Sequence, residues 1–189
     1  MKLHLGAGTI YLEGYINIDV NPDYLIDDAP QDVLKKNTTT FENYYKHKFK
    51  ESSNLCIVDI KSPITSLPFP DETIDEAVLI QVLEHIPKYG VNEVLKEIGR
   101  VLKIGGFLTV GVPDIKGLAE MLVSAKTTDD EDWCIRLIHG TQKNPWSHHY
   151  CGYTKRILIE TLSPWFHRFE ELQNISFYPS VYMKAFKEK

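Results

Sequence analysis

Cysteine is scarce in this chain of 189 residues, and the three that occur, Cys56, Cys134 and Cys151, lie far apart. Because their number is odd and no C-x-x-C pair occurs, the sequence indicates neither a disulfide framework nor a zinc site. Apolar runs long enough to cross a bilayer are also absent. Residues 1–3 lead directly into a predicted strand and leave no room for a signal peptide. We therefore expect a cytoplasmic protein that has no membrane span.

Positive charge is not in excess, since 21 Lys and Arg residues stand against 26 Asp and Glu residues and the net charge is -5. Binding to nucleic-acid phosphates depends on clustered Lys and Arg side chains, so no nucleic-acid partner is expected. The basic run at residues 46–50 is interpreted as a solvated helix face. Internal repeats, linkers and low-complexity tracts are missing too, and we predict a single domain over residues 1–189.

A pair of glycines follows the first predicted strand, residues 2–5. Gly6 and Gly8 flank Ala7, and because each glycine lacks a Cβ atom, a ligand can approach the backbone closely. The second predicted strand ends in Asp19. In a parallel α/β sheet, an acidic residue at this position is placed to accept hydrogen bonds from ribose hydroxyls. The stretch therefore predicts a site for an adenosine-containing cofactor, and the alternative is a tight turn without a ligand.

The same stretch lacks two features of a nicotinamide-dinucleotide site. In the pattern G-x-G-x-x-G the third glycine would follow Gly8 by three residues, where this chain has Tyr11. Residues 9–14 are also too few to hold the helix of an ordinary parallel crossover, so this connection is expected to be a loop or a single turn. A nicotinamide-dependent oxidoreductase is therefore the least favoured of the functions considered.

Beyond the second strand, short apolar runs alternate with amphipathic segments. Strands are predicted over residues 54–60, 74–80 and 107–112, and helices over residues 41–50, 89–102, 115–125 and 154–162. Two extended runs near the end, residues 169–178 and 181–186, are expected to pair in antiparallel fashion. The alternation predicts an α/β fold in which both faces of a parallel sheet are covered.

Four motifs follow one another within residues 3–114. They are residues 3–8 with Asp19, residues 66–71 with Ile74 and Asp75, residues 82–86, and residues 100–108. In this order and spacing they resemble the class I S-adenosylmethionine-dependent methyltransferases, and in particular small bacterial members similar to methyltransferase type 11. The resemblance implies a Rossmann-like, seven-stranded, mostly parallel sheet with helices on both faces and a C-terminal antiparallel strand pair. It also implies S-adenosyl-L-methionine as the cofactor.

The resemblance further implies which residues bind the cofactor. They lie at the ends of the first four strands and are Gly6, Ala7, Gly8, Asp19, Asp59, Ile60 and Gln81. Asp19 would accept hydrogen bonds from both ribose hydroxyls, because a carboxylate has enough acceptor sites for two donors. Asp59 is the acid nearest the expected adenine site, and Gln81 would face the methionine portion. The family usually has an acid just before the position of Ile64, where this chain has Pro63.

Histidines mark the predicted acceptor side. A hydroxyl acceptor needs a general base, and His85, just after the fourth strand, and His149 are the predicted catalytic residues. The alternative role of His85 is to fix its loop and cap the following helix. Residues 130–153 are the expected lid over the acceptor site, in which Trp146 would stack on a flat or sugar ring. The spacing of the histidines, His148 included, does not require a metal ion, and none is predicted.

The predicted reaction is methylation of an oxygen on a small-molecule acceptor such as a carbohydrate or a related metabolite. N-methylation of a small amine is the first alternative, and a non-catalytic nucleoside-binding module with the same fold is the second. The acidic balance of the chain makes a protein or nucleic-acid substrate less favoured. The sequence does not indicate an oligomeric state.

Overall fold

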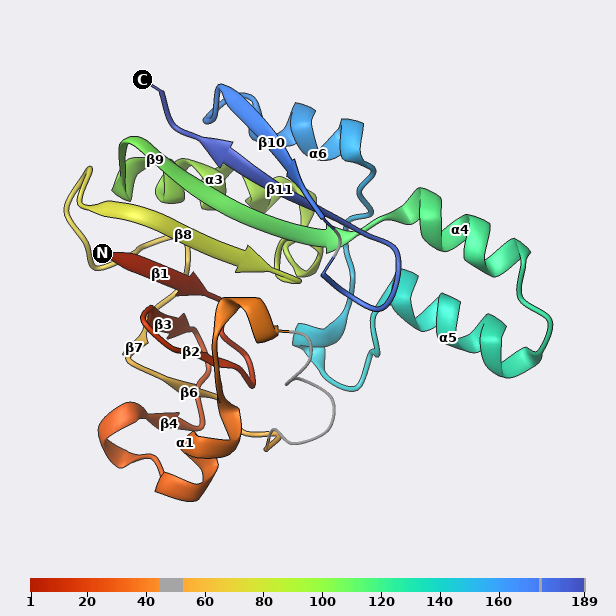
Figure 1. Ribbon diagram of the computed structural model, residues 1–189, viewed down its shortest axis with the longest axis horizontal. Coiled ribbons are helices and arrows are strands. Elements are labelled where there is room, and N and C mark those ends of the chain that lie inside the picture. Colours follow the sequence, from red (N-terminus) through yellow and green to blue (C-terminus); the bar gives the residue numbers. More distant parts are fainter. Residues whose placement is uncertain (45–52, 174, 189) are drawn as a thin grey trace.

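The computed structural model describes residues 1–44, 53–173 and 175–188. Its centre is a seven-stranded sheet with the strand order β10-β11-β9-β8-β1-β3-β7 (Figure 1). The strands are β1 (Lys2–Leu5), β3 (Ile16–Asp19), β7 (Ile60–Lys61), β8 (Ile74–Ile80), β9 (Leu102–Pro113), β10 (Arg168–Leu172) and β11 (Ser180–Phe186). Neighbouring strands from β9 to β7 pair in parallel, whereas β11 runs antiparallel to both β9 and β10. The predicted fold class and its C-terminal antiparallel pair are confirmed.

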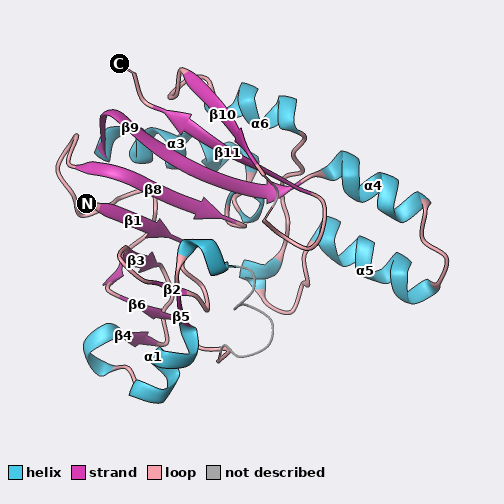
Figure 2. Ribbon diagram, in the orientation of Figure 1, coloured by secondary structure: helices cyan, strands magenta, loops and turns pink. Residues whose placement is uncertain are grey.

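Two helices cover one face of this sheet, α3 (Lys88–Val101) and α6 (Lys155–Leu162), as Figure 2 shows. On α3, apolar side chains recur every three or four residues and are buried. They are Val91, Val94, Leu95, Ile98 and Val101. Leu158 and Leu162 of α6 belong to the same core as the buried side chains of β1, β8 and β9. The apolar spacing of residues 89–102 therefore predicted this helix to within one residue at each end.

Short segments pack on the opposite face. Ile10 and Leu12, from the connection between β1 and β3, form a second core cluster with buried side chains of β8 and β11 and with Tyr44. The segments include β2 (Tyr11–Leu12), which pairs with β5 (Thr38–Thr39), and the 3-10 helix η2 (Phe41–Asn43). Further along the sheet lie β4 (Tyr24–Leu25), which pairs with β6 (Ile57–Val58), the 3-10 helix η1 (Ile26–Asp28) and α1 (Gln31–Asn37).

The connection between β1 and β3 is held by the buried side chain of Asn17 on β3. Its Nδ2 donates to the carbonyl oxygens of Leu12 at 3.1 Å and Tyr15 at 3.0 Å. Its Oδ1 accepts from the backbone nitrogen of Leu12 at 2.7 Å and from Nδ1 of His4 at 2.9 Å. Several hydrogen bonds of this connection are therefore supplied by one side chain, and others come from the backbone and from the pairing of β2. The predicted short connection without a helix is what the structure shows.

The predicted strand over residues 54–60 is divided in two. Asp59, between β6 and β7, turns its carboxylate toward β3, where Oδ2 accepts from the backbone nitrogen of Asn17 at 2.6 Å. Because of this turn, β6 pairs with β4 and only β7 pairs within the main sheet.

Other expectations differ from the structure at their ends. The extended run predicted over residues 169–178 contains a shorter strand, β10, which ends at Leu172. Strand β9 begins at Leu102 rather than at residue 107, and Gly105, at φ +84°, lies where the β8–β9 register shifts. Of the helix predicted over residues 41–50, η2 and Tyr44 are described. Residues 45–50, which contain the basic run, lie outside the described residues.

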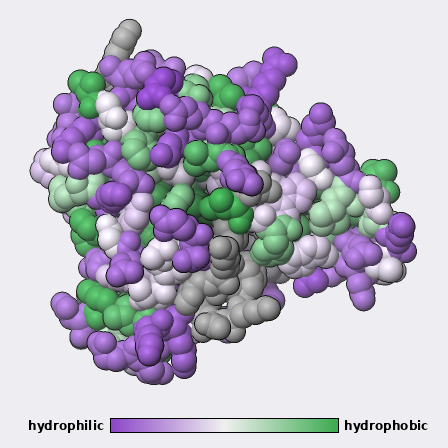
Figure 3. Space-filling view, in the orientation of Figure 1, coloured by the Kyte–Doolittle hydropathy of each residue, from purple (hydrophilic) through white to green (hydrophobic). Residues whose placement is uncertain are grey.

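Two helices extend away from the sheet, α4 (Ile115–Val123) and α5 (Thr128–His139), and lie side by side (Figure 1). Thr127 caps α5 by accepting from the backbone nitrogen of Asp130 at 3.1 Å. Figure 3 shows that hydrophilic residues dominate this face of the molecule, with an apolar tip on the helix pair, where Val123 is 87% exposed. In the described part of the chain, every helix falls short of the length and apolar character that a bilayer span needs.

We predict that Asn17→Ala destabilises the fold by roughly 2 to 4 kcal/mol, because buried backbone groups of Leu12 and Tyr15 lose their partners. The measurement is urea unfolding followed by circular dichroism. Asn54→Ala is the control, since Asn54 is exposed, and it should change the free energy of unfolding by less than about 0.5 kcal/mol. Equal stability of the two variants would contradict the role assigned to Asn17.

Candidate active site

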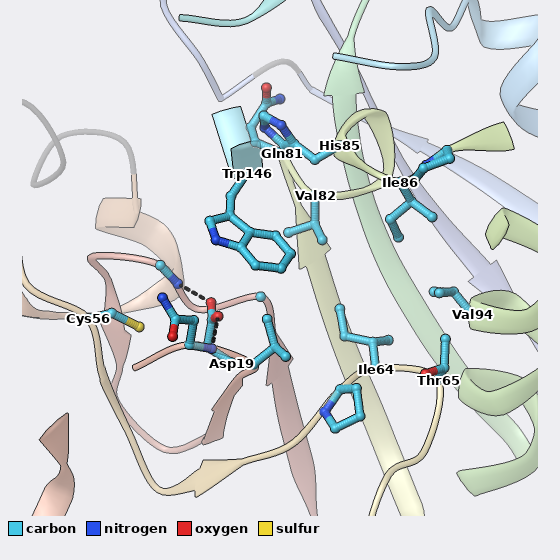
Figure 4. A pocket seen from close by; sticks show the side chains of 16 residues that line it. Asp19, Cys56, Ile64, Thr65, Gln81, Val82, His85, Ile86, Val94 and Trp146 are labelled. Carbon is cyan, nitrogen blue, oxygen red and sulfur yellow. Dashed lines mark hydrogen bonds between the residues drawn. The ribbon is translucent and has the colours of Figure 1, made fainter. Parts of the chain in front are cut away.

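A cavity of about 530 Å³ opens at the carboxyl ends of β1, β3, β7 and β8. From β1 the chain proceeds to β3 and β7 on one side and later returns to β8 and β9 on the other, so the strand order reverses between β1 and β8. Ligands of open α/β sheets bind at such a reversal. The cavity wall includes Gly8, Asp19, Ile64, Gln81, His85 and Trp146 (Figure 4).

The glycine turn after β1 forms the floor of the cavity. Gly6 has φ +68° and its backbone nitrogen donates to the carbonyl oxygen of Ile18 at 2.9 Å. A Cβ atom on Gly6 would lie 2.6 Å from Cγ2 of Val82, so this glycine allows β1 to pack against the segment after β8. Gly8 differs, because a Cβ atom there would meet nothing within 4 Å. Its bare backbone leaves space for a ligand.

Asp19, at the end of β3, presents its carboxylate to the cavity. Its Oδ2 accepts from the backbone nitrogen of Gly8 at 3.0 Å, and its Oδ1 accepts from that of Asn21 at 3.2 Å (Figure 4). These two hydrogen bonds fix the orientation of the carboxylate. Each oxygen retains further acceptor capacity, so Asp19 can still accept from two hydroxyl groups of a ligand.

Gln81 directly follows β8 and has a φ of +55°, which side-chain-bearing residues seldom adopt. Its Oε1 accepts from the hydroxyl of Tyr178 at 2.7 Å. Its Nε2 is buried and has no hydrogen-bond partner among the described residues. A strained backbone and a buried donor without a partner are features that persist at ligand sites. Tyr178, a residue that sequence reasoning missed, engages the Oε1 end of this amide.

Three of the predicted cofactor residues do not line the cavity. Ala7 is buried in a small core cluster, and Ile60 packs against the main core. Asp59 is engaged within the fold, since its Oδ1 accepts from the hydroxyl of Tyr11 at 2.7 Å while its Oδ2 holds β3. Burial, and then the hydrogen bond to Asp59, raise the pKa of Tyr11.

Residues after β7 line the cavity where Asp59 and Ile60 were expected. They are Pro63, Ile64 and Thr65. Sequence reasoning named Ile64 and Pro63 but gave no role to Thr65. The signal that could have found it is position, because these residues follow β7 just as Val20 and Asn21 follow β3, and parallel strands end at one edge.

The two histidines predicted to be catalytic lie together. His85 ends the 3-10 helix η3 (Leu83–His85) and lines the cavity, and its ring centroid is 4.6 Å from that of His149. His85 Nδ1 lies 2.8 Å from the carbonyl oxygen of His148. Burial, and then the nearby His85, lower the pKa of His149 to about 4, so its ring is neutral at pH 7. His148 precedes His149 in the chain, and its ring contacts that of Tyr150.

The segment predicted as a lid divides into two parts. Residues 130–139 belong to α5, which packs on α4, whereas Trp146 lies in the 3-10 helix η4 (Pro145–Ser147) at the cavity. Asn144 caps η4 by accepting from the backbone nitrogen of Trp146 at 2.9 Å. The indole is 65% exposed and points into the cavity (Figure 4). An exposed aromatic ring at the edge of a cavity is suited to stacking on a bound ring.

Comparison with known proteins agrees with this geometry. The sequence model of a family described as "Methyltransferase domain" matches residues 13–110, which is more than half of the chain. The chain belongs to this family. This match confirms the prediction from its motifs that the chain is a class I S-adenosylmethionine-dependent methyltransferase, with S-adenosylmethionine as the cofactor. None of the curated proteins compared with this methyltransferase matches it.

Solved structures share the fold of this methyltransferase at low sequence identity. A Thermotoga maritima protein, described as a possible histamine N-methyltransferase, is 15% identical with a TM-score of 0.54, over 100% of this chain and 81% of that one. A Methanosarcina mazei methyltransferase is 15% identical with a TM-score of 0.54, over 100% and 92%. The 1,6-didemethyltoxoflavin N1-methyltransferase of Burkholderia thailandensis, solved with S-adenosylhomocysteine, is 13% identical with a TM-score of 0.54, over 100% and 71%.

We predict that the stability of this methyltransferase falls as the pH drops from about 6.5 to 4, partly through His149. Its pKa is lowered from 6.5 to about 4 in the fold, so the unfolded chain takes up a proton first and is favoured as the pH falls. His149→Gln should therefore lose about 1 to 2 kcal/mol less than the wild type between pH 7 and pH 4.5, a figure reduced for partial exposure.

The measurement is chemical unfolding at both pH values in the presence of EDTA. His167→Gln, at an exposed histidine outside the site, serves as the control and should follow the wild type. A pH dependence that is the same in all three proteins would contradict the assignment.

Proposed function

We propose that this methyltransferase methylates an oxygen atom of a small molecule, such as a hydroxyl of a carbohydrate or a related metabolite. The observation that carries the proposal is the cavity of about 530 Å³ that has Asp19 in one wall and His85 in another. This volume lies within the range of about 300 to 1,000 Å³ that is usual for sites of small ligands. The cavity therefore suits a nucleoside cofactor and a small acceptor better than a folded macromolecule.

The residues of the cavity fit S-adenosylmethionine. In the proposed arrangement Asp19 accepts hydrogen bonds from the ribose hydroxyls, with its carboxylate already held by Gly8. The backbone of Gly6 and Gly8 lies against the methionine portion, and Nε2 of Gln81, which is buried without a partner in the described chain, donates to that portion. Apolar Ile64 borders the adenine.

Bound in this way, S-adenosylmethionine supplies a methyl group on a positively charged sulfur, which leaves with the electron pair of the broken carbon–sulfur bond. The acceptor oxygen forms the new bond to the methyl carbon and gives up its proton. His85 is the ionisable side chain of the acceptor wall, and its Nδ1 is occupied by the carbonyl of His148. Its Nε2 therefore carries the lone pair that acts on the acceptor, with His149 packed behind it.

Trp146 contributes by excluding water and by aligning the acceptor. An in-line displacement depends on holding the acceptor atom close to the methyl carbon, and a ring stacked on the acceptor restricts its position. The indole reaches the cavity from η4, in the later part of the segment predicted as a lid, residues 130–153, and this part is anchored beside His85. Backbone nitrogens of Tyr150 and Cys151 donate to the carbonyl oxygen of Glu84 at 2.8 and 3.2 Å.

N-methylation of a small amine is the second candidate. Two structures with the same fold are described as N-methyltransferases, one of them as possibly specific for histamine. A neutral amine already has a lone pair and needs less help from a base than a hydroxyl does. The pair of histidines at the acceptor wall favours the oxygen acceptor for this chain.

We also propose a cytoplasmic location, because its three cysteines are free thiols.

We predict that S-adenosylhomocysteine binds the wild-type protein and binds Asp19→Asn at least about 10- to 100-fold more weakly, because hydrogen bonds to a charged acceptor are lost. Isothermal titration calorimetry measures both affinities. Asp59→Asn is the matched variant, since the same change at an acid outside the cavity should lower the melting temperature but leave the affinity within about threefold. Absence of binding by the wild type would refute the cofactor site, and an affinity loss confined to Asp59→Asn would restore the adenine role first expected of that residue.

We predict that the wild type transfers the methyl group to at least one hydroxyl compound in a panel of sugars, phenols and amines, and that Trp146→Ala raises KM for that compound. The assay measures release of S-adenosylhomocysteine. Turnover with amines alone would favour N-methylation, and binding of S-adenosylhomocysteine without any turnover would favour the non-catalytic module. Ser163→Ala, on the exposed end of α6, is the control for the Trp146 variant.

A further inference from the structure

Three metal-ligating side chains converge beside the acceptor wall. They are Glu84, His85 and His149, whose potential ligand atoms all lie within 4.8 Å of one another. We propose that these three residues bind one divalent transition-metal ion. Sequence reasoning predicted no metal site, because it compared His85 with His148 and His149 and did not place the Glu84 carboxylate in the group.

The orientation of the two rings carries the proposal. Nδ1 of His85 lies 2.8 Å from the carbonyl oxygen of His148, and Nδ1 of His149 lies 3.2 Å from that of Ile138. A carbonyl oxygen can only accept, so both Nδ1 atoms carry the hydrogen and, in the neutral rings, both Nε2 atoms carry a lone pair. Histidine ligands of metal ions are typically oriented in this way, by a backbone carbonyl on the other ring nitrogen.

The backbone around the three residues is already connected. Tyr150 and Cys151 donate their backbone nitrogens to the carbonyl oxygen of Glu84, so the segment that carries His149 is fixed to the segment that carries Glu84 and His85. Ligand atoms that share one cation at about 2.1 Å lie about 3 to 4 Å apart. The potential ligand atoms of the three residues lie at most 4.8 Å apart, which is within about 1 to 2 Å of that spacing.

The donor set indicates which cations fit. Two imidazole nitrogens and one carboxylate oxygen suit Zn²⁺, Fe²⁺, Co²⁺ or Mn²⁺, whereas Ca²⁺ and Mg²⁺ prefer oxygen ligands throughout. Glu84 is 1% exposed and supplies the negative charge, while His85 lines the cavity and offers the path of entry. Three protein ligands leave coordination positions open, as in catalytic metal sites.

The open positions would face the acceptor, and this consequence rests on the function proposed above. A hydroxyl oxygen bound to a divalent cation is held in place and loses its proton more readily than in water. The ion would then take over the activation of the acceptor, and His85 would hold the ion instead of receiving the proton itself. Metal binding by the three residues can be tested without any acceptor.

The experiment titrates the full chain, treated with EDTA and dialysed, with MnCl₂, CoCl₂ and ZnCl₂ in a calorimeter, and records the visible absorption of the Co²⁺ form. One ion per chain should bind the wild type. Glu84→Gln and His149→Gln should each weaken binding by at least about 10- to 100-fold. His167→Gln removes an exposed histidine outside the cluster and should bind as the wild type does.

Each outcome decides the proposal. Absence of stoichiometric binding by the folded wild type overturns it, and so does binding that falls as much in His167→Gln as in His149→Gln. If Glu84→Gln does not fold by circular dichroism, the His149→Gln and His167→Gln pair still decides. Titration of the same preparations with S-adenosylhomocysteine separates failure of the metal site from failure of the cofactor site. A wild-type protein that binds S-adenosylhomocysteine but no metal ion overturns the metal site alone. Methyl transfer that EDTA leaves unchanged and added Mn²⁺ does not stimulate overturns the role of the ion at the acceptor.

Discussion

The rest of the site depends on the hydrogen bonds that the Asn17 side chain makes. Residues 9–14 are too few for a helix, and the Asn17 amide provides three of the hydrogen bonds of this connection from within β3. Asn17 is two residues from Asp19, and its backbone nitrogen is in turn held by Asp59. The same few bonds therefore set the course of the connection after Gly8 and the position of the Asp19 carboxylate that Gly8 orients.

A second constraint couples the cofactor side to the acceptor side. Gly6 has no Cβ, and Val82 occupies the space that one would need. Val82 lies between Gln81, which faces the cavity with a buried amide, and the turn that carries Glu84 and His85. Only one residue, Val82, therefore separates the tip of β1 from the turn that carries these two residues. The glycine turn after β1 and the turn that carries Glu84 and His85 therefore pack together through Val82.

Much of the fold could be predicted because its signals are local. The apolar stripe of α3 and the glycine turn need only neighbouring residues to be recognised. Asp59 shows the limit, because it stands at the end of an apolar run just as Asp19 does. What separates the two acids is their partners: Tyr11 and Asn17 engage Asp59, and the backbone of Gly8 and Asn21 orients Asp19. The contacts of Asp59 join residues 48 and 42 positions apart in the chain, and no spacing rule specifies them.

The acceptor wall shows the same limit of prediction from sequence. Its motif, residues 82–86, is hard to divide into structural and functional residues. Sequence reasoning left open whether Glu84 and His85 fix a loop or act on a substrate, and the structure gives each residue both kinds of contact. The carbonyl of Glu84 holds the segment of Tyr150 and Cys151, while its side chain meets two imidazoles. His85 binds the carbonyl of His148 through one ring nitrogen and lines the cavity. The contacts of Glu84 and His85 with residues 148–151 use a backbone carbonyl and Nδ1, so a structural role for these residues is compatible with a role in chemistry.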